Sequence, residues 1–422
     1  MHLRVADALE HGKAADDLTV ERFAHHLWAA GPLADPSRTA DALICAGTTA
    51  AAKSAFEAAD RLLQSAAQIA RRAGLADVEL SALSHLTAVV GMRSGYVGSA
   101  LDLLQRAEQL ARELGREREA ADLLFSRWAA HSQGIRLDRA APLARRLLEQ
   151  GEASADQMVR AYGWSAWGIH QWDVGNIGEA FRYLGRANST GLQALPGGGD
   201  DPLRRDLQLL WPVMFAMMTA LHGDVAASRS RFDELEVNAE DDPYAITVWA
   251  AFSVVTAALA GDPVWASRAA DRGIAVDPEY SFVFLGGYQR LARCWARAVT
   301  GDDPAGAAAE AEAIIGAVLL DPPRSGLAAW YGLLAEMLLA ADLPARAAEA
   351  LTRAEESLDA HGQRYPEGLL LLLRARVQQA RGEPAAAVRT TAERARLLSI
   401  EREAHLFAHR SEVMLSEMNR LN

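Results

Sequence analysis

The sequence has few of the residues that identify most enzymes and metal proteins. Two cysteines in 422 residues, Cys45 and Cys294, are too few for a disulfide framework or a cysteine-based zinc site, and they fit a reducing compartment. No Gly-x-x-x-x-Gly-Lys-Ser/Thr stretch is present, so there is no phosphate-cradling loop for ATP. Neither Gly-x-Ser-x-Gly nor His-Glu-x-x-His occurs. We therefore expect no catalytic residues, no metal and no cofactor.

Positive charge and long apolar runs are also scarce. Lys and Arg number 43 against 55 Asp and Glu, which gives a net charge of −12 and opposes direct contact with nucleic acid. No run of eighteen apolar residues occurs, and the first ten residues lack the apolar core of a signal peptide. These features predict a cytoplasmic protein that contacts neither membrane nor nucleic acid.

What the sequence does have is a period of about forty residues. Small turn residues recur along the chain, most of them followed by alanines and a branched residue. Nine such copies predict a stack of helix hairpins, in which each unit packs only on its neighbours. The turns begin at or near Ala51, Gly95, Gly134, Gly175, Gly223, Gly261, Gly301, Ala341 and Gly382.

The segments between these turns have the pattern of amphipathic helices. Apolar residues return every three or four positions, as in the stripe from Leu101 to Leu114, which ends at a helix-capping Gly115. Several turns combine a glycine, an acidic residue and a proline, which end one helix and begin the next. Runs of β-branched residues are brief. The fold class is therefore predicted as all-α: a right-handed α-solenoid of tetratricopeptide-like hairpins.

The spacing also predicts how the chain is divided. Residues 1–35 form two helices that cap the array, and residues 36–422 form the array itself. One interval is longer than the others and contains Leu195-Pro-Gly-Gly-Gly-Asp-Asp-Pro202, which indicates a loop insertion near 194–203. The end of the chain, from residue 395 on, is interpreted as the last repeat helix followed by one capping helix.

The first repeat narrows the choice of family. Ala24-His-His-Leu-Trp-Ala-Ala-Gly31, then Ala46-Gly47 and Ala50, then Ala55-Phe-Glu-Ala-Ala-Asp-Arg-Leu-Leu63 follow closely. This succession resembles the start of the helical-repeat region of large ATP-binding regulators of the LuxR type and related signal-transduction ATPases of bacteria. Its ATPase module and DNA-binding helix-turn-helix have no counterpart in this sequence, which is either the sensor region of such a regulator or a stand-alone relative. The resemblance implies that the repeats receive an effector or partner.

Aromatic residues in the first helix of successive hairpins are the candidates for a binding site. Large rigid rings at equivalent positions of stacked helices could line one concave groove, with polar neighbours orienting a ligand. The richest segment is Trp164 to Trp172, whose residues fall on more than one face of a helix. The candidate groove residues are Trp128, His131, Trp167, His170, Gln171, Trp211, Trp249, Tyr288, Gln289 and Trp330.

Simpler interpretations stand beside this one. A tryptophan in the first helix often fills the space between paired helices. His25 and His26 are adjacent and cannot chelate one metal together, and His405 and His409 have zinc-compatible spacing without further ligands nearby. An enzyme using His131 or His170 as an acid–base group is a third alternative, but no site is assembled around either residue.

The favoured hypothesis is a non-enzymatic sensor module of a bacterial transcriptional regulator. It binds a protein partner or a small-molecule effector on its concave surface and changes the curvature of the array. The alternative is a protein–protein assembly scaffold or homodimerisation module without a small-molecule ligand.

Overall fold

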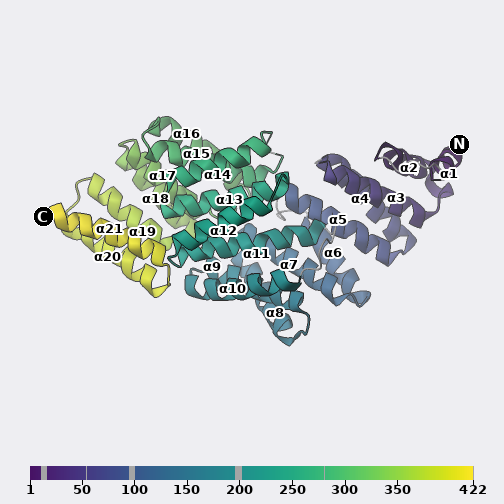
Figure 1. Ribbon diagram of the computed structural model, residues 1–422, viewed down its shortest axis with the longest axis horizontal. Helices are drawn as coiled ribbons and strands as arrows, with labels where there is room; N and C mark the ends of the chain where they lie inside the picture. Colours follow the sequence, from purple (N-terminus) through teal and green to yellow (C-terminus); the bar gives the residue numbers. More distant parts are fainter. Residues whose placement is uncertain (11–16, 54, 95–99, 195–201, 280, 422) are drawn as a thin grey trace. The chain divides into compact units, whose positions relative to one another are not determined.

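The structure is a computed structural model, and it describes residues 1–10, 17–53, 55–94, 100–194, 202–279 and 281–421. These residues form twenty-one α-helices and no strand (Figure 1). Gly31–Leu33 forms a short 3₁₀ segment, and Ile315–Leu319 widens into a π-helical turn after α16. The predicted all-α class is confirmed.

The helices follow the predicted period. From Gly134 on, each predicted turn residue lies between two helices, whereas Ala51 is still in the last turn of α3. Gly175, Gly223 and Gly261 have positive φ, which glycine adopts without a steric cost. Gly95, Ser54 and most of the loop insertion near 194–203 lie outside the described residues. The hairpins pair α3 with α4, and so on to α19 with α20: α3 (Pro36–Ala52), α4 (Phe56–Ala73), α5 (Ala76–Ser94), α6 (Ala100–Glu113), α7 (Glu117–Gln133), α8 (Leu137–Ala153), α9 (Gln157–Asp173), α10 (Ile177–Ala194), α11 (Pro202–Leu221), α12 (Val225–Asn238), α13 (Pro243–Ala260), α14 (Pro263–Val276), α15 (Val283–Val299), α16 (Pro304–Ile314), α17 (Leu327–Ala340), α18 (Pro344–His361), α19 (Glu367–Ala380) and α20 (Ala385–Glu401).

The turn sequences cap the helices as their chemistry predicts. Asp262 accepts a hydrogen bond from the backbone N–H of Trp265, at 2.9 Å, and Pro263 is the first residue of α14. Asp303 caps α16 in the same way through Gly306, at 3.1 Å. Each cap satisfies a backbone donor that the first turn of a helix would otherwise leave unpaired.

Helices α1 (His2–Glu10) and α2 (Asp17–Ala30) precede the hairpins, and α21 (His405–Leu421) follows them. The chain divides into two compact units: unit 1 comprises Met1–Ala130 and Pro196–Leu207, and unit 2 comprises His131–Leu195 and Gln208–Asn422. This division falls inside the array, and the boundary after residue 35 stays a prediction. The capping role of the terminal helices stays a prediction.

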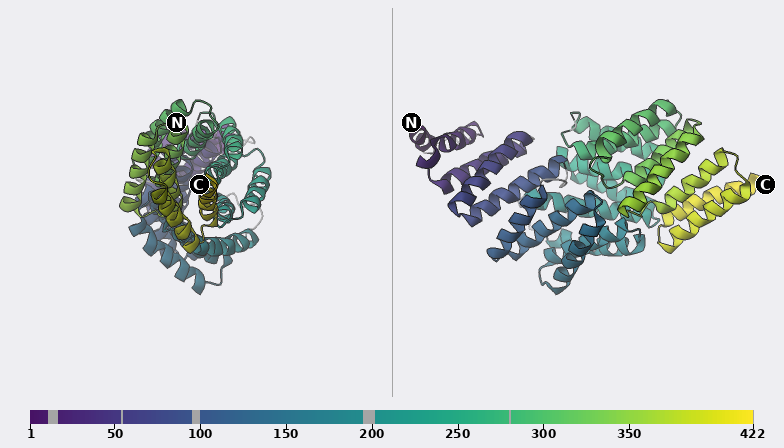
Figure 2. Two further views of the ribbon diagram at one scale, coloured as in Figure 1. Left: turned by 90° about the vertical axis from the view of Figure 1, so that its left-hand side faces the viewer. Right: turned by 180° about the vertical axis from the view of Figure 1, so that it is seen from behind.

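Unit 2 curves until its two ends touch. Seen end-on, its helices follow a curve that returns towards its start (Figure 2, left). Two backbone hydrogen bonds join its first and last repeats: Arg364 N–H donates to Asp173 O at 2.6 Å, and Gly178 N–H donates to Arg402 O at 3.3 Å. Residues about 190 and 220 positions apart in the sequence are therefore neighbours in space.

Helix α13 is one of the two most apolar helices of unit 2, together with α17. By length and composition alone it could cross a membrane, with a mean hydropathy of 1.6 over eighteen residues, but 72% of that window is buried inside the protein. It packs against α12, α14 and α15. We interpret α13 as a core helix of the solenoid, because other helices surround it.

Candidate functional site

The site is built around α9, the helix that carries the Trp164–Trp172 segment. Asp156 caps its start through the N–H of Met158, at 2.7 Å. Two glycines let the neighbouring helices approach closely: a Cβ at Gly163 would lie 2.6 Å from the backbone oxygen of Leu147 in α8, and one at Gly168 would lie 2.9 Å from Leu184 in α10. As a result α9 is buried on almost every side, which explains its apolar residues on more than one face.

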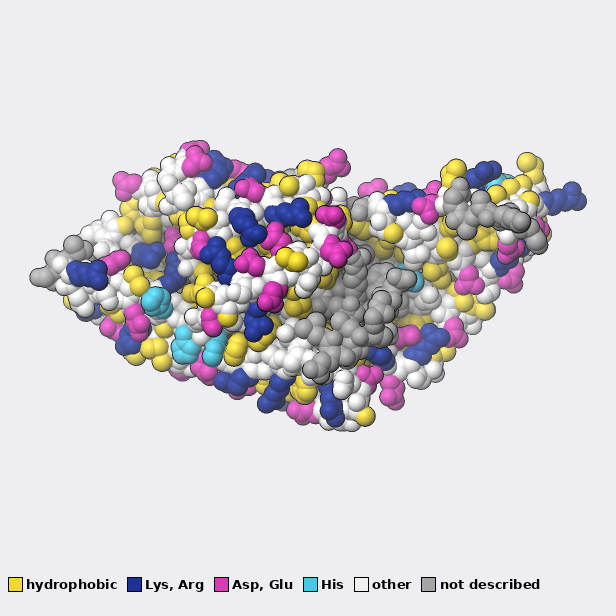
Figure 3. Space-filling view, in the orientation of Figure 1, with side chains coloured by type: hydrophobic (Ala, Val, Ile, Leu, Met, Phe, Trp, Pro, Cys, Tyr) yellow, Lys and Arg dark blue, Asp and Glu magenta, His cyan; other side chains and the backbone are white. Residues whose placement is uncertain are grey.

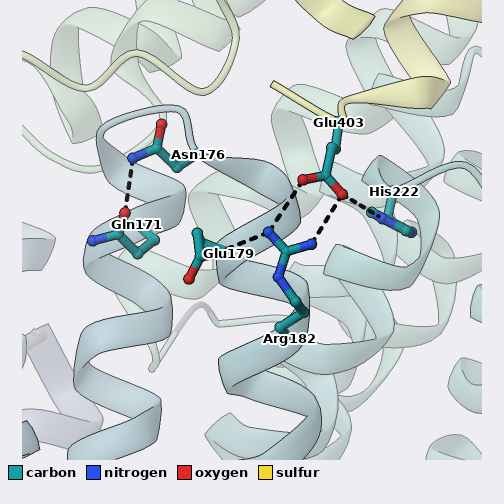
Figure 4. A network of polar contacts seen from close by, with 6 residues as sticks. All are labelled: Gln171, Asn176, Glu179, Arg182, His222 and Glu403. Carbon is teal, nitrogen blue, oxygen red and sulfur yellow. Dashed lines mark hydrogen bonds and ion pairs between the residues drawn. The ribbon is translucent and has the colours of Figure 1, made fainter. Parts of the chain in front are cut away.

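Trp167 and Gln171 have different environments on this helix. Trp167 is partly exposed, and its ring lies 5.5 Å from that of His170 and 6.0 Å from the guanidinium carbon of Arg145. Gln171 is buried, and its side-chain oxygen accepts a hydrogen bond from Asn176 at 2.8 Å (Figure 4). Of the two, Trp167 is the side chain that a ligand could reach without displacing a helix.

His170 is buried beside Trp167. Burial lowers the pKa of its imidazole, and the nearby charge of Arg145 lowers it further. The ring is therefore neutral at pH 7 and can act as a hydrogen-bond donor and acceptor. Its Nδ1 atom has no hydrogen-bond partner among the described residues.

Four of the candidate tryptophans lie between helices. Their exposed fractions are 1–2%, because the largest side chain fills the space between paired helices. Trp249, for example, donates its indole N–H to the backbone oxygen of Phe232 at 2.7 Å. A ligand could therefore reach these rings only if helices part, and their role in binding stays a prediction. They are Trp128, Trp211, Trp249 and Trp330.

The other candidates are tied to loops and neighbouring helices. Gln289 is buried and donates to Thr247 O at 3.3 Å, and the hydroxyl of Tyr288 donates to Ser325 O at 2.6 Å. Tyr288 and Trp330 are stacked at 6.2 Å. His131 is partly exposed near the C-terminal end of α7. The candidates in α15 and α17 are therefore adjacent to one another, and those in α9 form a separate group.

A buried polar cluster at the end of α9 escaped the sequence analysis. Asp173 accepts hydrogen bonds from Ser132 at 2.8 Å and from Gln363 at 2.7 Å. Burial raises the pKa of Asp173 to about 7, although both hydrogen bonds favour the charged form. Gln363 also donates to Ser325 Oγ at 2.9 Å and accepts from Gly326 N–H at 2.8 Å. One carboxyl group thus joins three segments of unit 2.

A second polar cluster connects α10 and the end of α11 with the segment that follows α20 (Figure 4). Glu403 accepts two hydrogen bonds from Arg182 of α10, at 3.0 and 3.1 Å, and lies 3.5 Å from His222 at the end of α11. Arg182 also pairs with Glu179 at 3.0 Å. The Arg182 guanidinium lowers the pKa of Glu403. No local sequence pattern predicts this cluster, because Glu403 belongs to a repeat 220 positions away.

The third cluster is centred on Glu336 in α17. Its carboxylate accepts hydrogen bonds from Trp295 at 2.9 Å, Arg376 at 2.8 Å and Arg410 at 2.9 Å. Arg410 also donates to Leu259 O at 2.8 Å, which connects α21 with α13. Burial lowers the pKa of Arg410, and the charge of Glu336 opposes that shift.

The surface carries no large patch of one charge on the face drawn in Figure 3, where basic and acidic side chains are interspersed. Within the described ranges, no three His, Cys, Asp or Glu side chains are arranged to hold a metal ion. His26 does lie close to His2, with 2.9 Å between their Nδ1 atoms.

Comparison with known proteins gives the fold and little more. No protein-family model and no curated protein matches the sequence. Similar solved structures include a human IFIT1 dimer with PPP-AAAA, with 13% identity, a TM-score of 0.42 and coverage of 99% of this chain and 91% of that one. The APC/C hetero-tetramer Cut9–Hcn1 is similar with 15% identity and a TM-score of 0.39, and the match covers 97% of this chain and 86% of that one. The TPR domain of P58(IPK) is similar with 11% identity and a TM-score of 0.28, and the match covers 99% of this chain and 98% of that one.

Proposed function

We propose that the chain is a non-enzymatic sensor module of a bacterial transcriptional regulator. It binds an effector or a protein partner on the concave side of its hairpins, at α9 and the adjacent helices, and it acts in the cytoplasm. The regulator assignment rests on the resemblance of residues 24–63 to LuxR-type regulators. The binding assignment rests on the chemistry of α9.

One observation carries the binding assignment. Three buried polar atoms of α9 lack a hydrogen-bond partner in the described part of the chain: Ser165 Oγ, His170 Nδ1 and Trp172 Nε1. Native proteins leave few buried polar groups unsatisfied, and each costs about 1–3 kcal/mol. Three on one helix, beside the partly exposed Trp167, point to a helix that exchanges its present contacts for those of a ligand.

A ligand-binding experiment tests this proposal. Nucleotides, amino acids and short peptides are titrated against the full chain while tryptophan fluorescence is recorded, and native mass spectrometry detects a ligand retained in purification. We expect Trp167→Ala to weaken binding about tenfold or more, since a central aromatic contact contributes upward of 1–2 kcal/mol. The control is Val264→Ala, because Val264 is 74% exposed on α14. Equal binding by both variants would remove α9 from the site.

An assembly role is the second candidate, and a different observation favours it. Leu18, Trp28 and Leu33 are large apolar residues near the N-terminus with exposed fractions of 62%, 55% and 79%. Light scattering of the full chain and of a Trp28→Ser/Leu33→Ser variant distinguishes the two functions. A dimer that the variant abolishes supports assembly, and a monomer in both cases contradicts it.

A further inference from the structure

We propose that the junction between the first and last repeats of unit 2 is a releasable latch. The latch consists of residues 363–365 and 402–405 on one side, and residues 172–182 and 222 on the other. Its release opens the curve of unit 2 while every hairpin stays folded. The inference rests on the proposed function for its purpose, because a sensor needs two states between which an effector can select.

Opening the latch would leave the packing between neighbouring hairpins intact. In an array of repeats each unit is stabilised mainly by the units beside it. The latch instead joins repeats about 190 to 220 residues apart, through the hydrogen bonds Arg364–Asp173 and Gly178–Arg402. Separating these segments would break these two bonds and those that Ser325 N–H donates to Gln133 O and Arg410 to Leu259 O. It would also expose the buried rings of Trp172 and Tyr365, but it would leave the contacts between neighbouring hairpins in place.

The outer half of the latch is held by exposed charges. The side chains of Arg182 and Glu403 keep 48% and 39% of their surface in solvent. Ion pairs at such exposure contribute about 0.2–1 kcal/mol, and salt screens them. His222 adds a contact that depends on the same carboxylate, and it stacks on Phe181 at 4.3 Å. These interactions orient the two sides without fixing them permanently.

The inner half contains groups that oppose closure. Asp173 is fully buried, and the groups that set its pKa are neutral donors with no cation among them. Trp172 is stacked on Tyr365 at 4.4 Å, but its indole N–H finds no acceptor in the described ranges. Burying a carboxyl group without a cation costs free energy, and so does burying a donor without an acceptor. When the latch opens, water would form hydrogen bonds with both groups and remove this cost. The closed state is therefore only moderately favoured.

Opening would also uncover the residues next to the proposed binding site. Trp172 and Tyr365 would separate, and the end of α9, including Gln171, would become accessible. A peptide with aromatic or amide side chains could then replace the internal contacts, with stacking on Trp172 and hydrogen bonds to Gln171 and Asp173. Such a partner would bind the open state and shift the population toward it.

Hydrogen exchange of the full chain tests the latch. We expect Arg182→Ala to accelerate exchange of the amides in 172–178 and 363–366 about two- to fivefold, which is the loss expected from an exposed ion pair. The matched control is Arg186→Ala, one turn further along α10, where Arg186 contacts Tyr183 and makes no latch contact. Exchange in α15 should be the same in all three proteins.

A covalent lock gives the opposite result. A Cβ at Gly178 would fall within 2.5 Å of the Glu403 carboxyl group, so Gly178→Cys with Glu403→Cys places two thiols in that space. In a Cys45→Ser background, the oxidised protein should exchange at 172–178 and 363–366 at least about tenfold more slowly than the reduced protein, since a disulfide removes several kcal/mol of opening freedom.

Two outcomes would overturn the inference. Unchanged exchange in Arg182→Ala together with no effect of oxidation would show that the junction does not open. Equal acceleration in the latch and in α15 would show that it opens only when the whole unit unfolds. Neither readout needs a binding partner, so the latch can fail while the proposed function stands, and the reverse also holds.

Discussion

Asp173 shows what a single buried carboxyl group does to this protein. Its surroundings exclude water and supply neutral hydrogen-bond donors from Ser132 and Gln363. The pKa therefore rises from 3.8 to about 7. Between these two values the folded protein keeps a proton that the unfolded chain has released, so folding is linked to pH.

This linkage predicts a pH-dependent stability. The contribution of Asp173 to the free energy of unfolding is fully present below pH 3.8 and is lost as the pH rises through about 7. At 1.36 kcal/mol for each pKa unit, it amounts to on the order of 4 kcal/mol. We expect Asp173→Asn, which cannot ionise, to remove this loss of stability between pH 5 and 8. The measurement is the Tm of both proteins across that range. Parallel Tm curves for the two proteins would contradict the assignment.

The sequence marked α9 as an unusual helix, but it did not indicate the buried polar cluster at its end. The crowding of Trp164, Trp167 and Trp172 marked α9 as unusual, and Trp167 is partly exposed there. Asp173 is the last residue of α9, and no sequence pattern distinguishes it from an exposed carboxylate. Asp173 is hydrogen-bonded to Gln363, which lies 190 residues away in the sequence. A local sequence pattern cannot show that two such distant residues are neighbours in space.

At the scale of elements, close packing of α8 and α9 depends on a residue without a side chain. The Cβ of an alanine at position 163 would lie 2.6 Å from Leu147 O and 3.1 Å from the Cα of Leu148. Both neighbours are backbone atoms, which cannot rotate away as a side chain would. The two helices would have to separate along their length.

We therefore expect Gly163→Ala to destabilise unit 2 by about 1–3 kcal/mol, the usual cost of overpacking a core. The measurement is urea unfolding followed by circular dichroism. Gly316→Ala is the matched control, because no atom lies within 4 Å of a Cβ at that position and its φ is negative. If Gly163→Ala is as stable as the control, the interface between α8 and α9 is looser than described.

The period and turn chemistry predicted the elements well. Glycine, an acidic residue and proline gave the boundary between α13 and α14, and Asp262 caps α14 as expected. These features are local, so they can be inferred from a short stretch of sequence. Which tryptophans face solvent could not be inferred in this way, because a helix in the middle of an array has neighbours on both sides.

At the scale of the whole molecule, unit 2 differs from an open array because its last helix contacts a much earlier one. Arg410 of α21 donates to Leu259 O, 151 residues earlier, and to Glu336. A perturbation at the end of the chain should therefore reach the middle of the sequence directly, without passing through each intervening repeat.

Replacing Arg410 tests this coupling. We expect Arg410→Gln to destabilise unit 2 by on the order of 3 kcal/mol, because it leaves part of a buried charge cluster without its partner. The backbone amides at the C-terminal end of α13 should then exchange their hydrogens faster than in the parent protein. Arg420→Gln, on the exposed side of α21, serves as the control. Loss of stability without faster exchange in α13 would show that Arg410 acts only within the last repeats.

Ring closure in unit 2 also restricts how this protein can change in evolution. An open solenoid can gain or lose a repeat and simply become longer or shorter. Here Asp173 must meet Gln363, and Arg182 must meet Glu403. A duplication or deletion of one hairpin between them would rotate one end past the other and separate both pairs. The geometry therefore constrains the number of hairpins in this part of the chain, whereas a longer loop between two helices leaves both pairs in place.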